Sequence, residues 1–265
     1  VDTGSKTKQS KMKNKQMKAL RSIAAIGACV SLGAAANAAF VIDDFLVVDA
    51  SGVEGVETGI GVGAAVVSSS FAAPGALGGE RDLIAVRNVG IGNTATAVVE
   101  LLAGAAAANF GDNDGYGKLI YDGPTPPDTG PGEGDIDFTG LGGFDSTVYG
   151  NAIKLTLASD LAGTFARVVL YEAAGIWSQY DVAITTIGSP ADYTFPLAAP
   201  SSTGGGGADL TNIGAIELML DGTGVNASDM GVGTFEIVPE PSTYLAGLGA
   251  LGMLGYAIRR RKTAA

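Results

Sequence analysis

Carboxylates and aromatic rings are the groups of this chain that could do chemistry, because the sequence contains no histidine and a single cysteine, Cys29. The absence of histidine excludes Ser-His-Asp and Cys-His nucleophiles, histidine-ligated zinc and the commonest general base near neutral pH. Since Cys29 lies in an N-terminal apolar run, the residues after it can form neither a disulfide nor a thiolate metal site. Oxygen ligands and ring surfaces are the remaining chemical resources.

One group of carboxylates has the composition of a calcium loop. Residues 112–117 have the sequence Asp-Asn-Asp-Gly-Tyr-Gly, which is similar to the opening of an EF-hand loop. The EF-hand pattern then fails, because tyrosine stands at its fifth position and glycine stands where the twelfth-position glutamate is required. Asp112, Asp114 and Asp122 are still candidate oxygen ligands for a Ca²⁺ ion held by β-sandwich loops, and no other cofactor is expected. The alternative is a turn rich in Asp and Asn with no ion.

A second candidate site is aromatic. Tyr171, Trp177 and Tyr180 lie close together in the sequence around an expected turn, and Trp177 is the only tryptophan. Aromatic rings beside acidic side chains are a common means by which β-sandwiches bind sugars, so these three residues are candidates for a carbohydrate site. Ordinary packing is the competing interpretation, because aromatic side chains mostly supply buried area.

Carboxylate catalysis is not expected. Asp43 and Asp44 are adjacent in the sequence, and Asp135 and Asp137 are two apart. A glycosidase needs its two carboxyl groups at a defined separation across a cleft, which the sequence cannot supply. We therefore expect a protein that is not an enzyme.

Short strands are the elements that must position these side chains. Between residues 40 and 238, short segments rich in β-branched residues often alternate apolar with polar and are separated by glycine and proline clusters. No helical period is sustained, which predicts one all-β domain, an antiparallel β-sandwich of jelly-roll type. The expected strands are 40–48, 82–89, 95–102, 118–121, 152–157, 165–171, 181–187, 193–195, 213–220 and 233–238.

Three segments between these strands have other expected roles. Residues 103–108 are rich in alanine and could continue as a short helix, although Gly104 weakens that assignment. The runs 123–134 and 201–207 are expected to be flexible surface loops, since prolines lack a donor and glycines cost entropy to order. Because strands are expected on both sides of each loop, neither loop is taken as a domain boundary.

Residues 78–83, Gly-Gly-Glu-Arg-Asp-Leu, combine a tight turn with three charged side chains and lead into an expected strand. We expect a structural role for Arg81. It belongs either to a surface network with its acidic neighbours or to a buried clamp between elements.

The C-terminal residues have the three parts of a segment that enters a membrane and stops there. Pro239, Glu240 and Pro241 form a short motif, residues 244–258 are apolar and uncharged, and residues 259–262 are all basic. At about 1.5 Å per residue, about 15 helical residues reach about 22 Å, a marginal span for a hydrocarbon core about 30 Å thick. The basic cluster favours the cytoplasmic side, which places the motif and everything before it outside.

This arrangement closely resembles the PEP-CTERM sorting signal of Gram-negative bacterial envelope proteins. The resemblance implies that Pro239-Glu240-Pro241 is recognised by a membrane-embedded protease of the exosortase type. It also implies that the C-terminal helix holds the chain in the inner membrane until processing. An ordinary single-helix anchor is the alternative. Residues 78–83 and 209–216 are similar to segments of other PEP-CTERM proteins of unknown activity, and this second resemblance implies no reaction.

The N-terminal residues have the three parts of a secretory signal peptide. A basic region over 6–21, an apolar region over 22–32 and an A-x-A site that ends at Ala38 predict cleavage between Ala38 and Ala39. Lipid attachment at Cys29 is the alternative. We favour the signal peptide, because the apolar run continues past the cysteine to the A-x-A site.

The body between these two ends is strongly acidic, and the whole chain has a net charge of −11. Every Asp and Glu except Asp2 lies within residues 39–240. The basic residues there are Arg81, Arg87, Lys118, Lys154 and Arg167. Such a field repels nucleic acid and anionic lipid surfaces, although solubility alone would explain the same charge. We expect no nucleic-acid partner.

These observations predict an exported protein in three parts: a signal peptide with its upstream segment over 1–38, a β-sandwich over 39–237 and a sorting signal over 238–265. We expect it to pass through the inner membrane to the cell surface or the extracellular matrix. A structural or adhesive role in an exopolysaccharide or biofilm matrix is the leading hypothesis. A carbohydrate-binding module is the alternative, and a glycosidase ranks third.

Overall fold

Alternation of apolar and polar residues builds the strands of this protein. In β8 (Ala152–Ser159), Ile153, Leu155 and Leu157 are buried, whereas Lys154 and Thr156 between them are partly exposed. A period of two places the first set on one face of a sheet and the second set on the other. The computed structural model describes residues 39–45, 56–58, 65–72, 75–90, 96–102, 105–110, 113–124 and 136–239.

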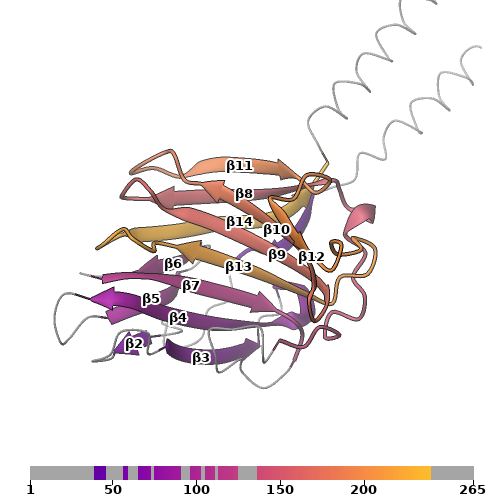
Figure 1. The fold of residues 1–265 in the computed structure, drawn as a ribbon, viewed down its shortest axis with the longest axis horizontal. Helices are drawn as coiled ribbons and strands as arrows, with labels where there is room; N and C mark the ends of the chain where they lie inside the picture. Colours follow the sequence, from indigo (N-terminus) through magenta and orange to yellow (C-terminus); the bar gives the residue numbers. More distant parts are fainter. Residues whose placement is uncertain are drawn as a thin grey trace, which may run out of the picture. The chain divides into compact units, whose positions relative to one another are not determined.

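The strands form two seven-stranded sheets, and every pairing between described strands is antiparallel. Sheet A contains, in spatial order, β11 (Ala191–Pro196), β8, β14 (Asp229–Val238), β6 (Ala105–Asn109), β5 (Thr96–Leu102) and β2 (Val56–Thr58), with β1 (Phe40–Asp43) beside β14. Sheet B contains β12 (Ser202–Gly204), β10 (Ile176–Ala183), β9 (Phe165–Ala173), β13 (Ala215–Asp221), β7 (Asn113–Tyr121), β4 (Glu80–Gly90) and β3 (Ala65–Ala72). Within the described ranges, two short 3-10 helices, η1 (Leu77–Gly79) and η3 (Ser146–Val148), lie between strands. The prediction of an antiparallel β-sandwich is confirmed (Figure 1).

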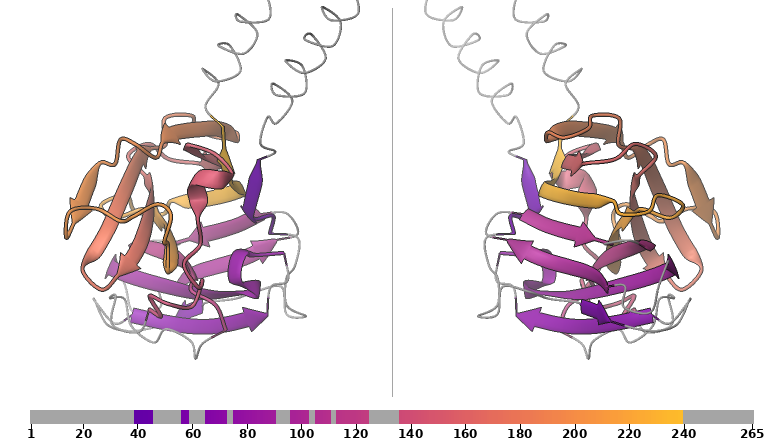
Figure 2. Two further views of the ribbon diagram at one scale, coloured as in Figure 1. Left: turned by 90° about the vertical axis from the view of Figure 1, so that its right-hand side faces the viewer. Right: turned by 90° about the vertical axis from the view of Figure 1, so that its left-hand side faces the viewer.

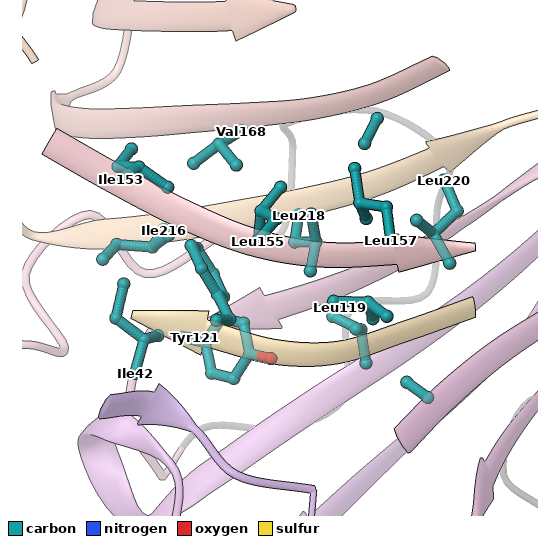
Figure 3. Packing of buried hydrophobic residues seen from close by; sticks show 14 of the residues in the cluster. Ile42, Leu119, Tyr121, Ile153, Leu155, Leu157, Val168, Ile216, Leu218 and Leu220 are labelled. Atoms are coloured by element: carbon teal, nitrogen blue, oxygen red, sulfur yellow. The ribbon is translucent and has the colours of Figure 1, made fainter. Parts of the chain in front are cut away.

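The main core lies between the inner faces of the two sheets. Leu155 and Leu157 from β8 of sheet A pack in one buried cluster with Leu119 from β7 and Leu218 from β13 of sheet B (Figure 3). Full burial of each such side chain contributes about 1.5–3 kcal/mol. Because the core fixes which side chains point inward, it also fixes which side chains of the same strands point outward.

Part of the outer face of sheet B is covered by residues 136–138. Ile136 and Phe138 from this segment pack in a second apolar cluster with outward side chains of the sheet. Phe138 meets Tyr171 edge-on, with 5.4 Å between ring centroids. A side chain at Gly214 would overlap the carbonyl of Phe138, so this close approach requires glycine.

A buried ion pair fastens β1 to the rest of the sandwich. Strand β1 itself lies beside β14 (Figure 2). Asp43 Oδ2 lies 3.3 Å from Arg81 Nη1 of β4 and accepts a hydrogen bond from the Tyr121 hydroxyl at 3.0 Å. Asp43 Oδ1 accepts the Phe45 N–H at 2.8 Å. Burial raises the pKa of Asp43, and the Arg81 charge opposes that rise. Of the two alternatives for Arg81, the buried clamp is confirmed.

The structure differs from the expected strands at several positions, and β7 and β14 begin at Asn113 and Asp229 rather than at residues 118 and 233. Residues 105–109, expected within a short helix, form β6, which pairs with β14 and β5 on its two sides. Hydrogen bonds to two neighbours outweigh the helix propensity of alanine. Strand β10 begins at Ile176 rather than at residue 181, and β12 lies inside the expected loop 201–207. Strands β2 and β3 were not among the expected strands.

The described residues lie within one compact unit, Ala38–Glu240. Along the described ranges, no helix has both the length and the apolar character that a membrane span needs. The predicted signal peptide (1–38), the apolar run 244–258 and Asp112 lie outside the described residues.

Candidate functional site

The outer face of sheet B carries polar and aromatic side chains from four adjacent strands, β10, β9, β13 and β7. The strand register aligns two rows on this face: Asp181, Arg167, Met219 and Lys118 in one, and Gln179, Val169 and Glu217 in the next. The residues between them in sequence, such as Val168 and Leu218, belong to the core. The same alternation that fills the core therefore builds this outer face.

A groove of about 620 Å³ runs over these rows. Its volume is within the usual range for small-ligand sites. It is lined by Tyr116, Lys118, Arg167, Val169, Tyr171, Trp177, Gln179, Glu217, Met219, Asp221 and Thr223. We call this set the sheet B groove.

Two of the three predicted aromatic residues line the sheet B groove. Trp177 and Tyr171 are paired across β10 and β9. Trp177 is partly exposed, and its indole packs against Gly204 of β12, where any side chain would overlap the ring. Tyr171 is only 2% exposed and packs against Phe138. Trp177 therefore offers a partly exposed indole to the groove, whereas Tyr171 supports the wall.

The prediction that Tyr180 belongs to the same aromatic site is wrong. Tyr180 is buried in the core, its hydroxyl donates to the Leu197 carbonyl at 2.6 Å, and its ring stacks on Phe195. Burial raises the pKa of Tyr180 to about 12. Because Trp177 and Tyr180 lie in one strand and are three residues apart, they point to opposite faces.

Tyr116 of β7 is a groove residue that the sequence pattern did not single out. Its ring is partly exposed and lies 5.8 Å from the Lys118 ammonium. Burial raises the pKa of Tyr116, and the carboxylates of Glu217 and Asp221 raise it further. The available signal was the alternation over 116–121, in which Tyr116 and Lys118 take the same face.

Both cations of the groove are paired with carboxylates. The Lys118 ammonium donates to Glu217 Oε2 at 2.9 Å, and this pair is buried. Arg167 Nε donates to Asp181 Oδ1 at 2.7 Å, and Gln179 Nε2 donates to Asp181 Oδ2 at 2.8 Å. These four polar side chains of the groove are thus held in place by carboxylate contacts before any ligand arrives.

Two of the predicted calcium ligands, Asp114 and Asp122, lie far apart. Asp114 lies at the start of β7, and Asp122 directly follows its end, so about 27 Å of extended strand separates them. Each carboxylate accepts a backbone N–H at 2.8 Å, Asp114 from Gly224 and Asp122 from Asp137. No cluster of three or more acidic, cysteine or histidine side chains suited to a metal ion occurs within the part of the chain that the structure describes. One ion therefore cannot contact both Asp114 and Asp122.

Calcium bound by Asp112 with Asp114 stays a prediction, since Asp112 is outside the described residues. A thermal unfolding comparison in CaCl₂ and in NaCl of equal ionic strength would test it. A calcium-specific rise in Tm should disappear in the variant with Asp112→Asn and Asp114→Asn.

The predicted processing positions lie at the borders of the described residues. Ala39 is the first of these and is exposed, and Pro239 is the last. The Asn151 N–H donates to the Val238 carbonyl at 3.2 Å, so ordered structure continues to the residue before the motif. Ala38, Glu240 and Pro241 are not described.

Comparisons with known proteins identify the C-terminal segment. Residues 238–262 match the family model of the PEP-CTERM protein-sorting motif, which confirms the resemblance for that segment. No curated protein shows significant similarity to the chain.

Among solved structures, the body is similar to the family 11 carbohydrate-binding module of the cellulase Lic26A-Cel5E of Clostridium thermocellum, with a TM-score of 0.38, 14% identity, and coverage of 78% of this chain and 98% of that one. It is similar to a family 29 carbohydrate-binding module with a TM-score of 0.33, 9% identity, and coverage of 71% and 92%. It is also similar to PfGH50B, with a TM-score of 0.39 and 12% identity. That match covers 55% of this chain and spans only 22% of PfGH50B.

Proposed function

We propose that this chain is an exported surface protein whose β-sandwich binds a polysaccharide in the sheet B groove. The observation that carries the proposal is the groove itself, in which the partly exposed rings of Trp177 and Tyr116 flank fixed polar side chains. Sugar rings present apolar faces that stack on aromatic rings and hydroxyl groups that need polar partners.

The PEP-CTERM motif supports the location. The motif implies export, a C-terminal membrane anchor before processing, and cleavage by an exosortase-type protease. In our proposal the processed body reaches the cell surface or the surrounding matrix, where extended polysaccharides are the abundant ligands. An adhesive role in that matrix would then follow from sugar binding.

Binding without cleavage is part of the proposal. Glycoside hydrolysis uses two carboxyl groups that face each other across the scissile bond. Of the two carboxylates that line the groove, Glu217 is engaged by Lys118, and Asp221 accepts the Thr223 N–H. Asp181, beside the groove, is engaged by Arg167 and Gln179. These contacts suit a recognition surface, because they fix the side chains that a sugar would meet.

A glycan array with the purified full-length chain tests the proposal, in a detergent without a sugar headgroup. We expect specific, saturable binding to at least one polysaccharide. In isothermal titration, Trp177→Ala should weaken binding about tenfold or more, because a stacked ring contributes about 0.5–1.5 kcal/mol beyond its buried area.

Ile187→Ala is the matched control, since Ile187 is an exposed apolar side chain outside the groove lining. Its affinity should equal that of the wild type. The absence of binding to any glycan, or an equal effect of both substitutions, would contradict the proposal.

A further inference from the structure

We infer that the sheet B groove selects an uncharged polysaccharide, a chain of neutral sugars, over uronate-bearing or sulfated polymers. The inference rests on the proposed function and adds the chemical class of the ligand. It follows from how the charges of the groove are already paired.

The groove has two cationic side chains that an acidic polymer could use, and both are engaged. Lys118 and Glu217 form a pair whose side chains are only 10% and 4% exposed. Arg167 pairs with Asp181 at 2.7 Å. A ligand carboxylate or sulfate would have to displace Glu217 from Lys118 or Asp181 from Arg167, or else share a cation whose charge that carboxylate already balances.

Displacing Glu217 is strongly unfavourable because of its burial. A buried carboxylate that loses its cation is left with its desolvation penalty and without the compensating attraction. The Arg167 pair is about one third exposed, so its disruption costs less, yet Asp181 also holds Gln179 and would be released from two partners. Neither cation is therefore a low-cost site for an anion.

The local balance of charge also opposes anions. Asp221 adds a carboxylate to the groove lining beyond the two ion pairs, and the chain as a whole carries a net charge of −11. Such a surface repels polyanions before contact. The rise in the pKa of Tyr116, for which burial is the main cause, has a further contribution from Glu217 and Asp221.

The groove does offer what a neutral chain needs. Trp177 on β10 and Tyr116 on β7 are three strand intervals apart across the sheet, about 14 Å, and six residues apart along the strands, about 20 Å. Both rings therefore contact one ligand only if it is an oligosaccharide. Between them, Asp181 holds Arg167 and Gln179 in fixed positions, which lowers the entropy cost of hydrogen bonds to hydroxyl groups.

Intrinsic fluorescence gives a direct readout, since Trp177 is the only tryptophan of the chain and lines the groove. The probes are a panel of neutral hexasaccharides with different β-linkages, an alginate oligosaccharide as the uronate, a sulfated oligosaccharide and a chitosan oligosaccharide as the polycation. Each is titrated into the full-length chain in a detergent without a sugar headgroup, at low and at high salt.

We expect a saturable change in emission with at least one neutral hexasaccharide, with the same midpoint at both salt concentrations. Alginate and the sulfated probe should give no saturable change. Glu217→Gln should gain weak alginate binding that high salt abolishes, because Lys118 then lacks its anionic partner.

Glu236→Gln is the matched control, because Glu236 pairs with Lys154 at 3.4 Å on sheet A, outside the groove. This variant should bind as the wild type does. Circular dichroism checks that Glu217→Gln folds. If it does not, the inference is still tested by whether the wild type binds the neutral hexasaccharides more tightly than the charged probes.

Tighter binding of alginate, the sulfated probe or chitosan than of every neutral hexasaccharide would overturn the inference and leave polysaccharide binding intact. If no probe binds and the glycan array is also blank, the proposed function fails, and the inference fails with it.

Discussion

Gly204 sets the position of the one indole that the sheet B groove presents. Its lack of a side chain lets β12 lie directly against Trp177, which is itself paired with Tyr171 on the other side. A ring held between two strands needs little reordering when a ligand stacks on it. The aromatic surface of the groove thus depends on a residue that no ligand touches.

Gly204→Ala should lower the affinity for the neutral glycan about tenfold, because the new methyl group displaces the indole from its stacking position. Stability should change by about 1 kcal/mol or less, since β12 is an edge strand. Isothermal titration measures the affinity, and urea unfolding measures the stability. Gly231→Ala is the control, because the nearest atom to a methyl there lies at an ordinary 3.6 Å. Unaltered affinity in Gly204→Ala would show that the contact with Gly204 does not position the ring for binding.

Tyr193 of β11 is a second residue whose chemistry is set by backbone groups. Its hydroxyl oxygen accepts the N–H groups of Thr185 and Thr186, both at 3.0 Å. Slight burial raises the pKa of Tyr193, but the hydrogen bonds from Thr186 and Thr185 outweigh that effect and lower it to about 8. The phenolate is therefore favoured in the folded state.

Absorbance at the phenolate band should show one tyrosine titrating near pH 8, and Tyr193→Phe should remove that step. The pKa of Tyr193 in the folded protein is below its ordinary value of 10.0, so the ionised tyrosine stabilises the fold, and this contribution is complete at pH values above 10.0. This contribution decreases as the pH falls and is lost below about pH 8. The appearance of tyrosinate only near pH 10 and above would contradict the hydrogen-bond geometry.

At the scale of elements, the sequence predicted strands wherever one face alternates clearly, as over 153–157 of β8. The prediction failed where apolar and polar residues do not alternate. The alanines of β6 became a strand because β14 and β5 pair with both edges, which no local pattern reveals.

The sequence predicted Trp177 and Tyr171 as site residues but missed Tyr116 and wrongly included Tyr180, because strand bounds and strand order are not visible in a local pattern. The expected strand began at residue 181, which left Trp177 in a turn, whereas β10 begins at Ile176. Successive side chains of a strand point to opposite faces, so Trp177 and Tyr180, three residues apart in one strand, lie on opposite faces of the sheet. Tyr116 joined the groove only through the strand order β10, β9, β13, β7, a non-local arrangement that one sequence does not contain.

The attachment of β1 is an element-scale consequence of one buried carboxylate. Asp43→Asn should destabilise the fold by about 3 kcal/mol, because the substitution removes one charge of a buried ion pair. Urea unfolding of the full-length chain measures this change. Asp192→Asn is the comparison, since the Asp192 side chain is 57% exposed in its pair with Lys154 and its loss should cost about 1 kcal/mol or less. Equal effects of the two substitutions would show that burial adds nothing to the clamp.

At the scale of the whole molecule, folding and sorting meet at the end of β14. Val238 is paired with Ala152, and its carbonyl accepts the Asn151 N–H, so the ordered strand reaches the residue before Pro239-Glu240-Pro241. Cleavage at or after the motif would leave every strand of the sandwich intact. The released body would keep both its core and the sheet B groove.

Glu240→Ala should therefore change location without changing the fold. The protease would lose the central residue of its motif, while the apolar run 244–258 would still hold the chain, so full-length protein should accumulate in the inner membrane. Membrane fractionation with immunodetection of the body measures this accumulation. Ser242→Ala is the control, because it leaves residues 239–241 unchanged.

The retained chain should have the same Tm and the same glycan affinity as the released body, because among the described residues neither the core nor the groove includes one beyond Val238. Normal release of Glu240→Ala would show that the protease reads another feature of the tail, and a loss of glycan binding in the retained chain would show that the groove depends on processing.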